Sequence, residues 1–445
     1  MDQTNGRTVT AHLTHRGEYL GSLGPFAVEE PWWSAVGPVA DRLRDASGVP
    51  VAVLRLAAVT GGAGGRGGHT TFHAEALERP ARRLPTGAAH AWPTARPQPE
   101  APLDPEALSA PEALSAPEDL TRPAARSGPA ALSGPAARRA DWATSDGLRA
   151  ALDWADAAAR AAGRPPEGPV RQIRSWNLSG LFLIPAAQGP LWLKTTSPAF
   201  NACEAGVIGL LGAVDPDLVP EVVAADPARR RVLLGDVPGE DCWGPSARTV
   251  EDVVSRLVAA QAALAGSDAL AAAGLPDRAP AALPGRVHRL LNGAGADGLT
   301  ADEVTAARAL ADRLPVLVAE LAACGLPETF VHGDFHPGNW RSDGRRTTLL
   351  DFADSCLGHP VLDGLRPRAF VSEECWARIA DTWARAWAVH APGSDPARAL
   401  TLAEPLAHLA YALRYQEFLE NIETSERPYH EGDPATEIRA ALACA

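Results

Sequence analysis

Apolar and polar positions alternate along the first part of the chain in a pattern that predicts several strands around one helix. The expected strands cover residues 9–15, 19–28, 50–59 and 70–77, and the expected helix covers residues 31–46. A glycine-rich run at residues 61–68 contains G-x-G-x-x-G. A dinucleotide site needs a helix directly after that pattern, and the extended sequence found there favours a flexible hairpin loop. We therefore expect a small α+β unit over residues 1–83.

The next stretch, residues 84–140, is dominated by Pro, Ala, Ser and Gly, and it repeats Glu-Ala-Leu-Ser-Ala-Pro from Glu106 and again from Glu112. Such a composition buries too little apolar surface to offset the entropy lost on ordering. We interpret it as a mostly disordered, low-complexity linker. An amphipathic helix is expected after it, over residues 141–162.

From residue 169 onward the pattern changes from strands to helices. Strands are expected over residues 171–184, 191–195, 219–224 and 231–234, with a helix over residues 202–211. After Gly239 the pattern is largely helical, interrupted by residues 330–352. This order predicts an α+β fold that is not doubly wound, with a β-rich lobe at 141–238 and a helical lobe at 239–445.

Composition excludes several classes of protein. The chain has 445 residues and a formal net charge of −13, which argues against a nucleic-acid partner because such partners need a basic face. No apolar run reaches the roughly 18 residues of a membrane span, and the N-terminal residues lack the apolar core of a signal peptide. Six cysteines without a C-x-x-C pair argue against a zinc site or a disulfide framework. We expect a cytoplasmic protein without a membrane partner.

A polar loop follows the apolar pair at residues 330–331 and runs His332-Gly-Asp-Phe-His-Pro-Gly-Asn339. Its glycines and proline prevent a regular helix, so Asp334 and Asn339 are displayed on a loop. The two histidines stand four residues apart, a spacing that zinc sites use on a helix. We therefore expect His332 and His336 to shape the loop and not to hold zinc.

A second acidic loop, residues 351–354, follows after a predicted hairpin. Asp343-Gly344 between extended residues is a strong hairpin signal. The hairpin would return Asp351 to the side of Asn339, and Asp354 is expected to help shape this second loop.

Two carboxylates and an amide that converge in this way suit phosphoryl transfer. The reaction needs a carboxylate that orients a hydroxyl and takes its proton, and oxygen ligands for the Mg²⁺ that bridges nucleotide phosphates. The spacing D-x-x-x-x-N matches the catalytic loop of protein kinases, and Asp351-Phe352 matches the start of their metal-binding D-F-G. We predict Asp334 as the catalytic base and Asn339 and Asp351 as Mg²⁺ ligands.

Lys194 is the only lysine among the 41 basic residues. Its survival in an Arg-rich chain indicates a need for the ammonium group, or chance at a surface position. It lies on an alternating strand, where it would point into a cleft between the lobes and hold phosphates, with Glu204 on the next helix as its partner. Upstream, residues 174–180 lie where a phosphate-covering loop belongs, and Ser179 there is either a phosphate ligand or part of a plain hairpin.

These motifs, with Gly358-His-Pro-Val-Leu-Asp363, resemble the aminoglycoside phosphotransferase family of small-molecule kinases, whose relatives act on choline, homoserine and fructosamine. The resemblance extends from about residue 170 to about residue 435. It implies a protein-kinase-like bilobal fold, preceded here by the small N-terminal unit and linker, which the family pattern does not include. It also implies that Asp363 braces the catalytic loop. The adenine contacts are expected at the lobe connection, from Leu234, Asp236 and Val237.

This sequence departs from the family pattern at three positions. Phe335 replaces the usual Leu, Gly364 stands where Leu is frequent, and Gly235 stands where an acidic residue is common. None of these positions carries a reacting group.

The acceptor side is expected to come from the C-terminal helices. Aromatic and acidic groups gather there, and the candidates are Tyr411, Tyr415, Glu426 and Tyr429. Such groups suit a cationic or polyhydroxylated acceptor. The same pattern also fits a core stripe with a solvated acidic face.

Together these features predict an ATP- or GTP-dependent kinase that phosphorylates a hydroxyl of a small molecule such as an antibiotic, an amino sugar or a related metabolite. A role in antibiotic resistance would follow from the first of these. The alternative is a nucleotide-binding pseudokinase or scaffold that acts through its N-terminal unit. The complete set of Lys194, Asp334, Asn339 and Asp351 favours the active enzyme.

Overall fold

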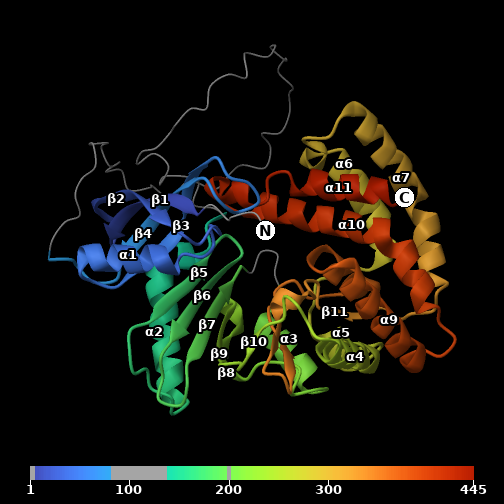
Figure 1. Cartoon of the computed structure of the whole chain (residues 1–445), viewed down its shortest axis with the longest axis horizontal. Helices are drawn as coiled ribbons and strands as arrows, with labels where there is room; N and C mark the ends of the chain where they lie inside the picture. The colour runs from blue at the N-terminus through green and yellow to red at the C-terminus, as the bar shows by residue number, and fades with distance from the viewer. Residues whose placement is uncertain (1–5, 82–137, 198–201) are drawn as a thin grey trace, which may run out of the picture.

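The structure, a computed structural model, describes residues 6–81, 138–197 and 202–445, and Figure 1 shows its layout. A four-stranded sheet with one helix comes first along the chain, then a five-stranded sheet, then a mostly helical region. This order confirms the predicted α+β fold, in which a small β-rich lobe precedes a helical lobe. Residues 84–137 of the predicted linker lie outside the described residues.

The N-terminal unit, residues 6–81, is a sheet with the strand order β2-β1-β4-β3 and one helix. Its elements are β1 (Arg7–His15), β2 (Glu18–Val28), α1 (Gly37–Ser47), β3 (Val51–Thr60) and β4 (His69–Ala76). β1 and β4 are parallel, and the other neighbours are antiparallel. The glycine-rich run connects β3 to β4, as the hairpin prediction required.

The predicted helix over residues 31–46 is wrong in its first turns, because α1 begins only at Gly37. The backbone N–H of Trp33 donates to the carbonyl of Gly65 at 2.7 Å, and Gly67 N–H donates to Pro31 at 2.9 Å. Residues 31–33 therefore pair with the glycine-rich loop, and that pairing overrides their helical spacing.

β3 is buried on both faces, which explains its continuous apolar run. Val51 and Val53 pack into the core of the N-terminal unit. Ala52 and Leu54 pack into a second core, which includes α2 (Ser145–Ala161) and the next sheet. Successive side chains of a strand point to opposite faces, so this one strand joins the N-terminal unit to the β-rich lobe.

The β-rich lobe contains a five-stranded antiparallel sheet. Its strands, in the spatial order β5-β6-β7-β9-β8, are β5 (Arg171–Ser175), β6 (Ser179–Ile184), β7 (Leu191–Thr196), β9 (Arg231–Gly235) and β8 (Val222–Asp226). The helix α3 (Glu204–Gly212) lies between β7 and β8 in the chain.

Three boundaries in this lobe differ from the predictions. Residues 171–184 form two strands joined by a turn, because the N–H of Trp176 donates to the carbonyl of Ser179 at 3.1 Å. The helix expected at 141–162 is split into a 3₁₀ turn, η3 (Asp141–Ala143), and α2, because Thr144 caps α2 by accepting from the N–H of Gly147. The strand expected from residue 219 starts at residue 222, two residues after Pro220, which has no N–H to donate to a ladder.

The helical lobe holds eight helices among the described residues. They are α4 (Ala247–Leu264), α5 (Asp268–Ala272), α6 (Leu283–Leu291), α7 (Ala301–Ala322), α8 (Val361–Leu365), α9 (Glu373–His390), α10 (Pro396–Asn421) and α11 (Asp433–Ala443). The 3₁₀ turns of the two lobes after η3 are η4 (Pro227–Arg229), η5 (Pro280–Ala282), η6 (Ala294–Ala296), η7 (Pro337–Asn339), η8 (Arg366–Phe370) and η9 (Thr424–Tyr429).

Short strands interrupt the helical lobe in more places than the single predicted segment. They are β10 (Glu240–Asp241), β11 (Thr329–Val331), β12 (Trp340–Ser342), β13 (Thr347–Leu349) and β14 (Cys356–Gly358). β12 and β13 form the hairpin predicted from Asp343-Gly344. β14 was missed, and it pairs antiparallel with β11 just before the polar loop.

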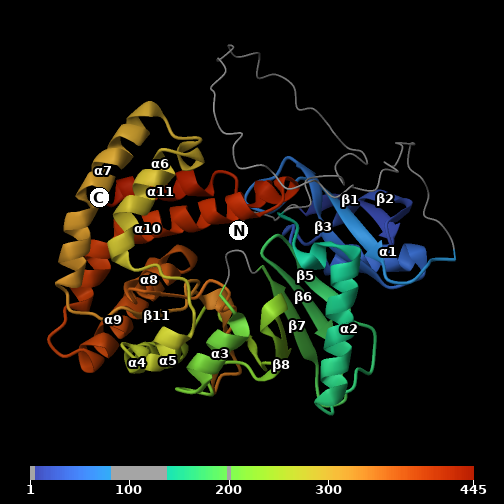
Figure 2. The same cartoon turned by 180° about the vertical axis from the view of Figure 1, so that it is seen from behind.

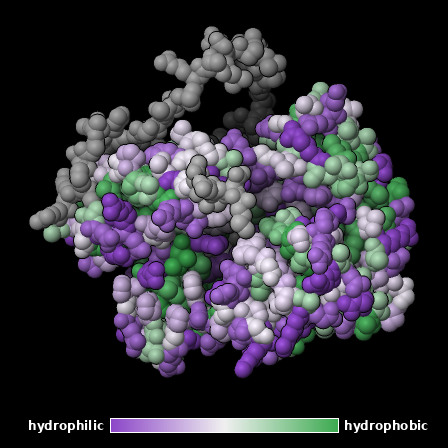
Figure 3. Space-filling model, viewed as in Figure 1, coloured by the Kyte–Doolittle hydropathy of each residue, from purple (hydrophilic) through white to green (hydrophobic). Residues whose placement is uncertain are grey.

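The N-terminal unit packs against a late segment of the helical lobe. In both Figure 1 and Figure 2, the N-terminal unit lies beside the C-terminal end of α10, and contacts between β3 and η9 join them. Figure 3 shows hydrophilic and hydrophobic residues intermixed on the visible face of the described chain. None of the described helices is both long and apolar enough to cross a membrane.

Candidate active site

The polar loop after β11 is fixed by its own backbone and by Asp363. Gly333 has φ +86°, and a Cβ placed there would lie 2.3 Å from the carbonyl oxygen of Asp354, so the position requires glycine. The Asp363 carboxylate accepts from the N–H groups of His332 at 2.7 Å and Gly333 at 2.9 Å, and from the Gln261 side chain at 2.8 Å. Asp363 therefore sets the path of the chain into the loop.

Asp334 lies at the centre of a dense set of donors. The Asn339 amide nitrogen donates to its carboxylate at 3.0 Å and to its carbonyl at 2.9 Å. The Arg366 guanidinium contacts Oδ1 at 2.8 Å, and His336 Nε2 lies 3.3 Å from Oδ2. Burial alone would raise the pKa of Asp334, but Arg366 and His336 outweigh it and hold that pKa well below its usual range. Asp334 is therefore ionised at neutral pH.

The hairpin returns the second acidic loop to this site. The N–H of Leu350 donates to the carbonyl of Asn339 at 2.9 Å, and the Leu350 carbonyl lies 3.1 Å from His332 Nε2. Asp351 follows with φ +64°, a left-handed conformation that few residues other than glycine adopt. Backbone strain of this kind is concentrated at functional sites. Burial lowers the pKa of His332 to about 4, so this ring is neutral at pH 7.

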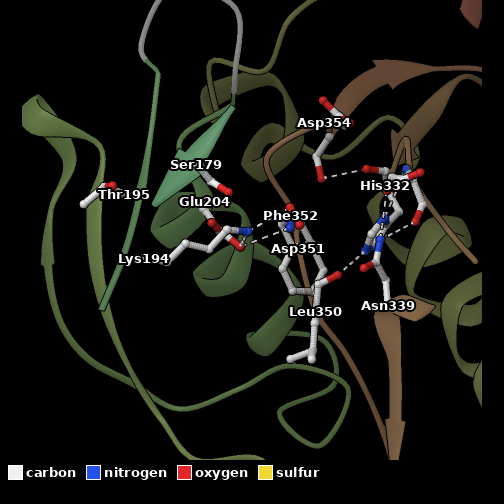
Figure 4. Close-up of polar contacts among 12 residues, drawn as sticks. Ser179, Lys194, Thr195, Glu204, His332, Asn339, Leu350, Asp351, Phe352 and Asp354 are labelled. Atoms are coloured by element: carbon white, nitrogen blue, oxygen red, sulfur yellow. Dashed lines mark hydrogen bonds and ion pairs between the residues drawn. The ribbon is translucent and has the colours of Figure 1, made fainter. Parts of the chain in front are cut away.

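Lys194 joins the two lobes at this point, as Figure 4 shows. Its Nζ lies 2.9 Å from Oε1 of Glu204 and 2.8 Å from Oδ1 of Asp351, and Glu204 also accepts from the N–H of Phe352 at 3.2 Å. Burial would lower the pKa of Lys194, but Asp351 and Glu204 outweigh it and raise that pKa above its ordinary value. The lysine therefore carries a positive charge between two carboxylates.

A cavity of about 410 Å³ opens over Asp334 and Asp351. Residues from η8, α10, η9 and the start of α11 line one side of it, and they include Arg366, Phe370, Tyr411, Arg414, Tyr415, Phe418, Tyr429, His430 and Asp433. The β-rich lobe contributes Trp176 and Ser179, and the N-terminal unit contributes Trp32 and Gly64. Three of the four predicted acceptor residues therefore face the same space as the predicted base.

The fourth predicted acceptor residue, Glu426, does not line this cavity. Its Oε1 accepts from the N–H of Leu56 in β3 at 2.9 Å, and burial raises its pKa to about 8. The structure thus places Glu426 in the contact between the helical lobe and the N-terminal unit.

The predicted nucleotide residues are only partly brought together. Ser179 lies beside Lys194 and Glu204 in Figure 4 and lines the same cavity as Asp334. Leu234 is buried in β9, while Asp236 and Val237 line a separate cavity of about 810 Å³. Asp236 accepts from the Trp192 indole at 2.8 Å, and the Val237 carbonyl accepts from Arg341 at 2.7 Å.

The remaining loop residues have structural partners. His336 stacks on Phe370 with ring centroids 4.1 Å apart, and its Nδ1 accepts from the N–H of Gly338. Asp354 is paired with Arg414 of α10. These contacts fix the walls of the cavity near the polar loop at residues 332–339.

Sequence reasoning missed the charged and aromatic groups that come from distant segments. Arg366 stands three residues after Asp363, but nothing in the local pattern indicates that its guanidinium reaches Asp334. Trp32 and Gly64 were assigned to a helix and a hairpin loop of an unrelated unit. Only the packing of that unit on both lobes shows that Trp32 and Gly64 line the cavity.

Asn339 and Asp351 can each offer a side-chain oxygen to Mg²⁺. The Asn339 nitrogen faces Asp334, which turns the amide oxygen elsewhere, and Lys194 contacts only Oδ1 of Asp351. A carboxylate and an amide oxygen are donors that Mg²⁺ accepts, with phosphate and water oxygens completing its shell. Among the described residues no group of three or more His, Cys, Asp or Glu is arranged to hold a metal. The pair therefore fits Mg²⁺ only together with a nucleotide.

A β-rich lobe, a lysine–glutamate pair and a D-x-x-x-x-N loop define a kinase-like phosphotransferase. The model of the phosphotransferase enzyme family (APH) matches residues 198–400, from just before α3 to the start of α10. The match confirms the resemblance expected from the motifs and the class of enzyme it implies, a small-molecule phosphotransferase.

Several solved structures are similar at low identity. A protein provisionally named fructosamine-3-kinase from Thermobifida fusca is 20% identical, with a TM-score of 0.47, over 65% of this chain and 98% of that one. A macrolide 2'-phosphotransferase from Brachybacterium faecium is 21% identical, with a TM-score of 0.42, over 63% and 98%. A choline kinase from Streptococcus pneumoniae is 14% identical, with a TM-score of 0.46, over 62% and 94%. No curated protein matches the chain.

Proposed function

We propose that this chain moves the γ-phosphoryl group of ATP or GTP to a hydroxyl of a small molecule, in a cleft between a lobe at residues 141–238 and a lobe at 239–445. The observation that carries the proposal is the convergence of Lys194, Glu204 and Asp351 beside the Asp334–Asn339 pair. Phosphoryl transfer depends on positioning and on electrostatic stabilisation, and both are present in this arrangement.

Each group has a separate task in this proposal. Lys194 holds the nucleotide phosphates, and Glu204 keeps the ammonium in place. Asn339 and Asp351 would hold Mg²⁺, which bridges the phosphates and neutralises the charge that develops on them. Asp334 orients the acceptor hydroxyl and accepts its proton at the carboxylate. Because Arg366 and His336 stabilise the ionised carboxylate, Asp334 stays unprotonated and available as an acceptor.

The acceptor class follows from the groups around the cavity. Aromatic rings of Tyr411, Tyr415 and Tyr429 line the same cavity as the carboxylates of Asp334 and Asp433. Flat apolar surfaces beside acidic groups suit an amino sugar, an aminoglycoside-type antibiotic or a related polyhydroxylated amine. The reaction would take place in the cytoplasm, where the nucleotide is supplied, and with an antibiotic as acceptor it would confer resistance.

The proposal is tested by acceptor-dependent ADP release with the purified full chain. Asp334→Asn keeps the size of the side chain and one acceptor oxygen, but it replaces the other oxygen by an N–H₂ donor and so removes the proton acceptor. Loss of a general base lowers kcat by about 10²–10⁴. Asp381→Asn is the matched control: Asp381 lies on the exposed face of α9, forms an ion pair with Arg385 at 2.9 Å, and its substitution is expected to retain full activity. Nucleotide binding without turnover in the wild type would favour the scaffold alternative.

A further inference from the structure

The N-terminal unit is anchored to both lobes. On the β-rich side, the Gln172 side chain accepts from the N–H of Val53 at 2.6 Å and donates to its carbonyl at 2.7 Å. On the helical side, the buried Arg55 guanidinium pairs with Glu423 just before η9. The same two segments are held together by the bond from Leu56 N–H to Glu426. The unit is therefore set at a fixed place relative to the cleft.

Two segments of that unit are tied together above the cleft. The Trp33 indole donates to the carbonyl of Gly67 at 2.8 Å, in addition to the backbone bond between Trp33 and Gly65. The Trp33 ring also meets the ring of Tyr429 edge-on, with centroids 5.4 Å apart. Because Tyr429 lines the cavity, this contact places residues 31–33 and the glycine-rich loop at its edge.

Trp32 and Gly64 are the parts of these segments that line the cavity. Trp33 is only 1% exposed and belongs to the core, whereas its neighbour Trp32 is 48% exposed. The guanidinium of Arg66 lies 5.7 Å from the centroid of the Trp32 ring and covers part of it. Gly64 has φ +58°, and the direction of its missing Cβ is open space. Neither residue is needed for the core of the unit.

The position of this wall separates it from the residues expected to contact adenine. The cavity includes Asp334, Asp351, Ser179 and the C-terminal tyrosines but not Leu234, Asp236 or Val237 of the lobe connection. Because Trp33 contacts Tyr429, the wall meets this cavity at the tyrosines, which we propose as the acceptor side of Asp334. An exposed indole that lines the same cavity as Asp334 and Asp433 is a surface on which a sugar ring or an amine packs through its apolar or cationic face.

We infer that Trp32 and the Gly64 tip form the outer wall of the acceptor pocket, so that the N-terminal unit sets which acceptors fit. The inference rests on the proposed function. Trp32 supplies a stacking face, and Gly64 leaves room that any side chain would fill. Both are specificity-determining residues and take no part in the transfer step.

The test uses the full chain and, as probe, whichever of glucosamine, kanamycin, erythromycin, choline and homoserine binds best by calorimetry. Trp32→Ala is expected to raise the Kd and the KM of that acceptor about tenfold, because a lost stacking contact is of that order. Trp32→Phe restores most of the affinity, since it keeps an aromatic face. Nucleotide KM and acceptor-free ATP hydrolysis stay at the wild-type level in both variants. Val389→Ala, at an exposed apolar residue of α9, is the control.

Gly64→Asn tests the size limit independently. Asn tolerates positive φ, so the loop keeps its conformation, and its side chain adds bulk at the part of the cavity that Gly64 lines. We expect the kcat/KM of the largest accepted molecule to fall about tenfold or more, and that of the smallest to change less. Gly17→Asn is the matched control, because Gly17 also has positive φ, +81°, and open space, but lies in the turn between β1 and β2.

The outcomes separate the two proposals. The inference is overturned if the wild type phosphorylates an acceptor and both Trp32→Ala and Gly64→Asn behave like their controls. The proposed function still stands in that case. An equal rise in nucleotide KM overturns it as well, because the wall would then shape the whole cleft. Wild-type protein that neither binds nor phosphorylates any member of the panel removes the proposed function and, with it, this inference.

Discussion

Replacing Lys194 by methionine removes the ammonium group and keeps the length of the side chain. The ammonium now lies 2.8–2.9 Å from Asp351 and Glu204, and the Lys194 and Glu204 side chains are only 9% and 4% exposed. Removing one partner of a buried ion pair costs about 3–5 kcal/mol, because the other charge is left uncompensated. Asp351 is 46% exposed and water can solvate it, so we take the lower end of this range.

The expected loss is thus about 3 kcal/mol, which lowers the unfolding midpoint by roughly 5 °C in a protein of this size. The loss should shrink in acid. Burial already raises the pKa of Glu204, and without Lys194 that pKa rises further. A carboxyl group whose pKa is higher in the folded than in the unfolded state stabilises the folded state at a pH below the unfolded pKa. That stabilisation is lost as the pH rises through the folded pKa. The variant should therefore approach the wild type in stability near pH 4.

Thermal unfolding of Lys194→Met and of the double variant Lys194→Met/Glu204→Gln, measured at pH 4 and pH 7, checks this reasoning. The double variant has no uncompensated carboxylate at position 204, so it should regain most of the midpoint at pH 7. It should stay inactive, because the ammonium group that we propose to hold the phosphates is still missing. A single variant as stable as the wild type at pH 7 would refute the buried-pair account, and an active double variant would refute the phosphate role of Lys194.

Three further outcomes are expected. Gly333→Ala should abolish turnover and lower the free energy of unfolding by about 2 kcal/mol or more, as measured by chemical unfolding. Gly393→Ala is the control, because Gly393 has a similar positive φ but no close neighbour, and it should lower that free energy by about 1 kcal/mol. Equal losses of stability would show that the Asp354 contact is unimportant. Arg366→Gln removes the cation that holds the pKa of Asp334 low, so the acidic limb of the plot of kcat/KM against pH should move to higher pH. An acidic limb that does not move would contradict the coupling between Arg366 and Asp334. Burial raises the pKa of Glu426 to about 8, so the wild type should lose stability between about pH 5 and pH 8 as that group ionises. Glu426→Gln should remove this decline. Denaturant titrations in which the variant keeps the same pH dependence would oppose this.

Local sequence patterns predicted much of the path of residues 332–339, because the geometry of this loop is local. Glycine and proline exclude a helix at residues 332–339, and Asp343-Gly344 fixes a two-strand hairpin. The prediction that Asp351 returns to Asn339 therefore needed only turn chemistry. Lys194 and Glu204 were paired through the family resemblance and the kinase pattern, and the structure places their charged atoms 2.9 Å apart.

Contacts between distant segments could not be predicted from such patterns. Residues 31–33 have helical spacing, yet they pair with the glycine-rich loop because Trp33 is buried against it. Arg366 reaches Asp334 only because η8 packs beside the catalytic loop. The sequence pattern predicted Glu426 as an acceptor ligand, but its carboxylate is buried against β3. Such burial depends on the whole fold.

The central claim, transfer of a phosphoryl group to a small-molecule hydroxyl, is tested most directly by ³¹P NMR of the wild-type chain with Mg²⁺, ATP and the best-bound acceptor. The account predicts a new phosphomonoester resonance that grows in step with ADP, and that is absent with Asp334→Asn. Release of inorganic phosphate alone, at a rate that the acceptor and the Asp334 substitution leave unchanged, would contradict it.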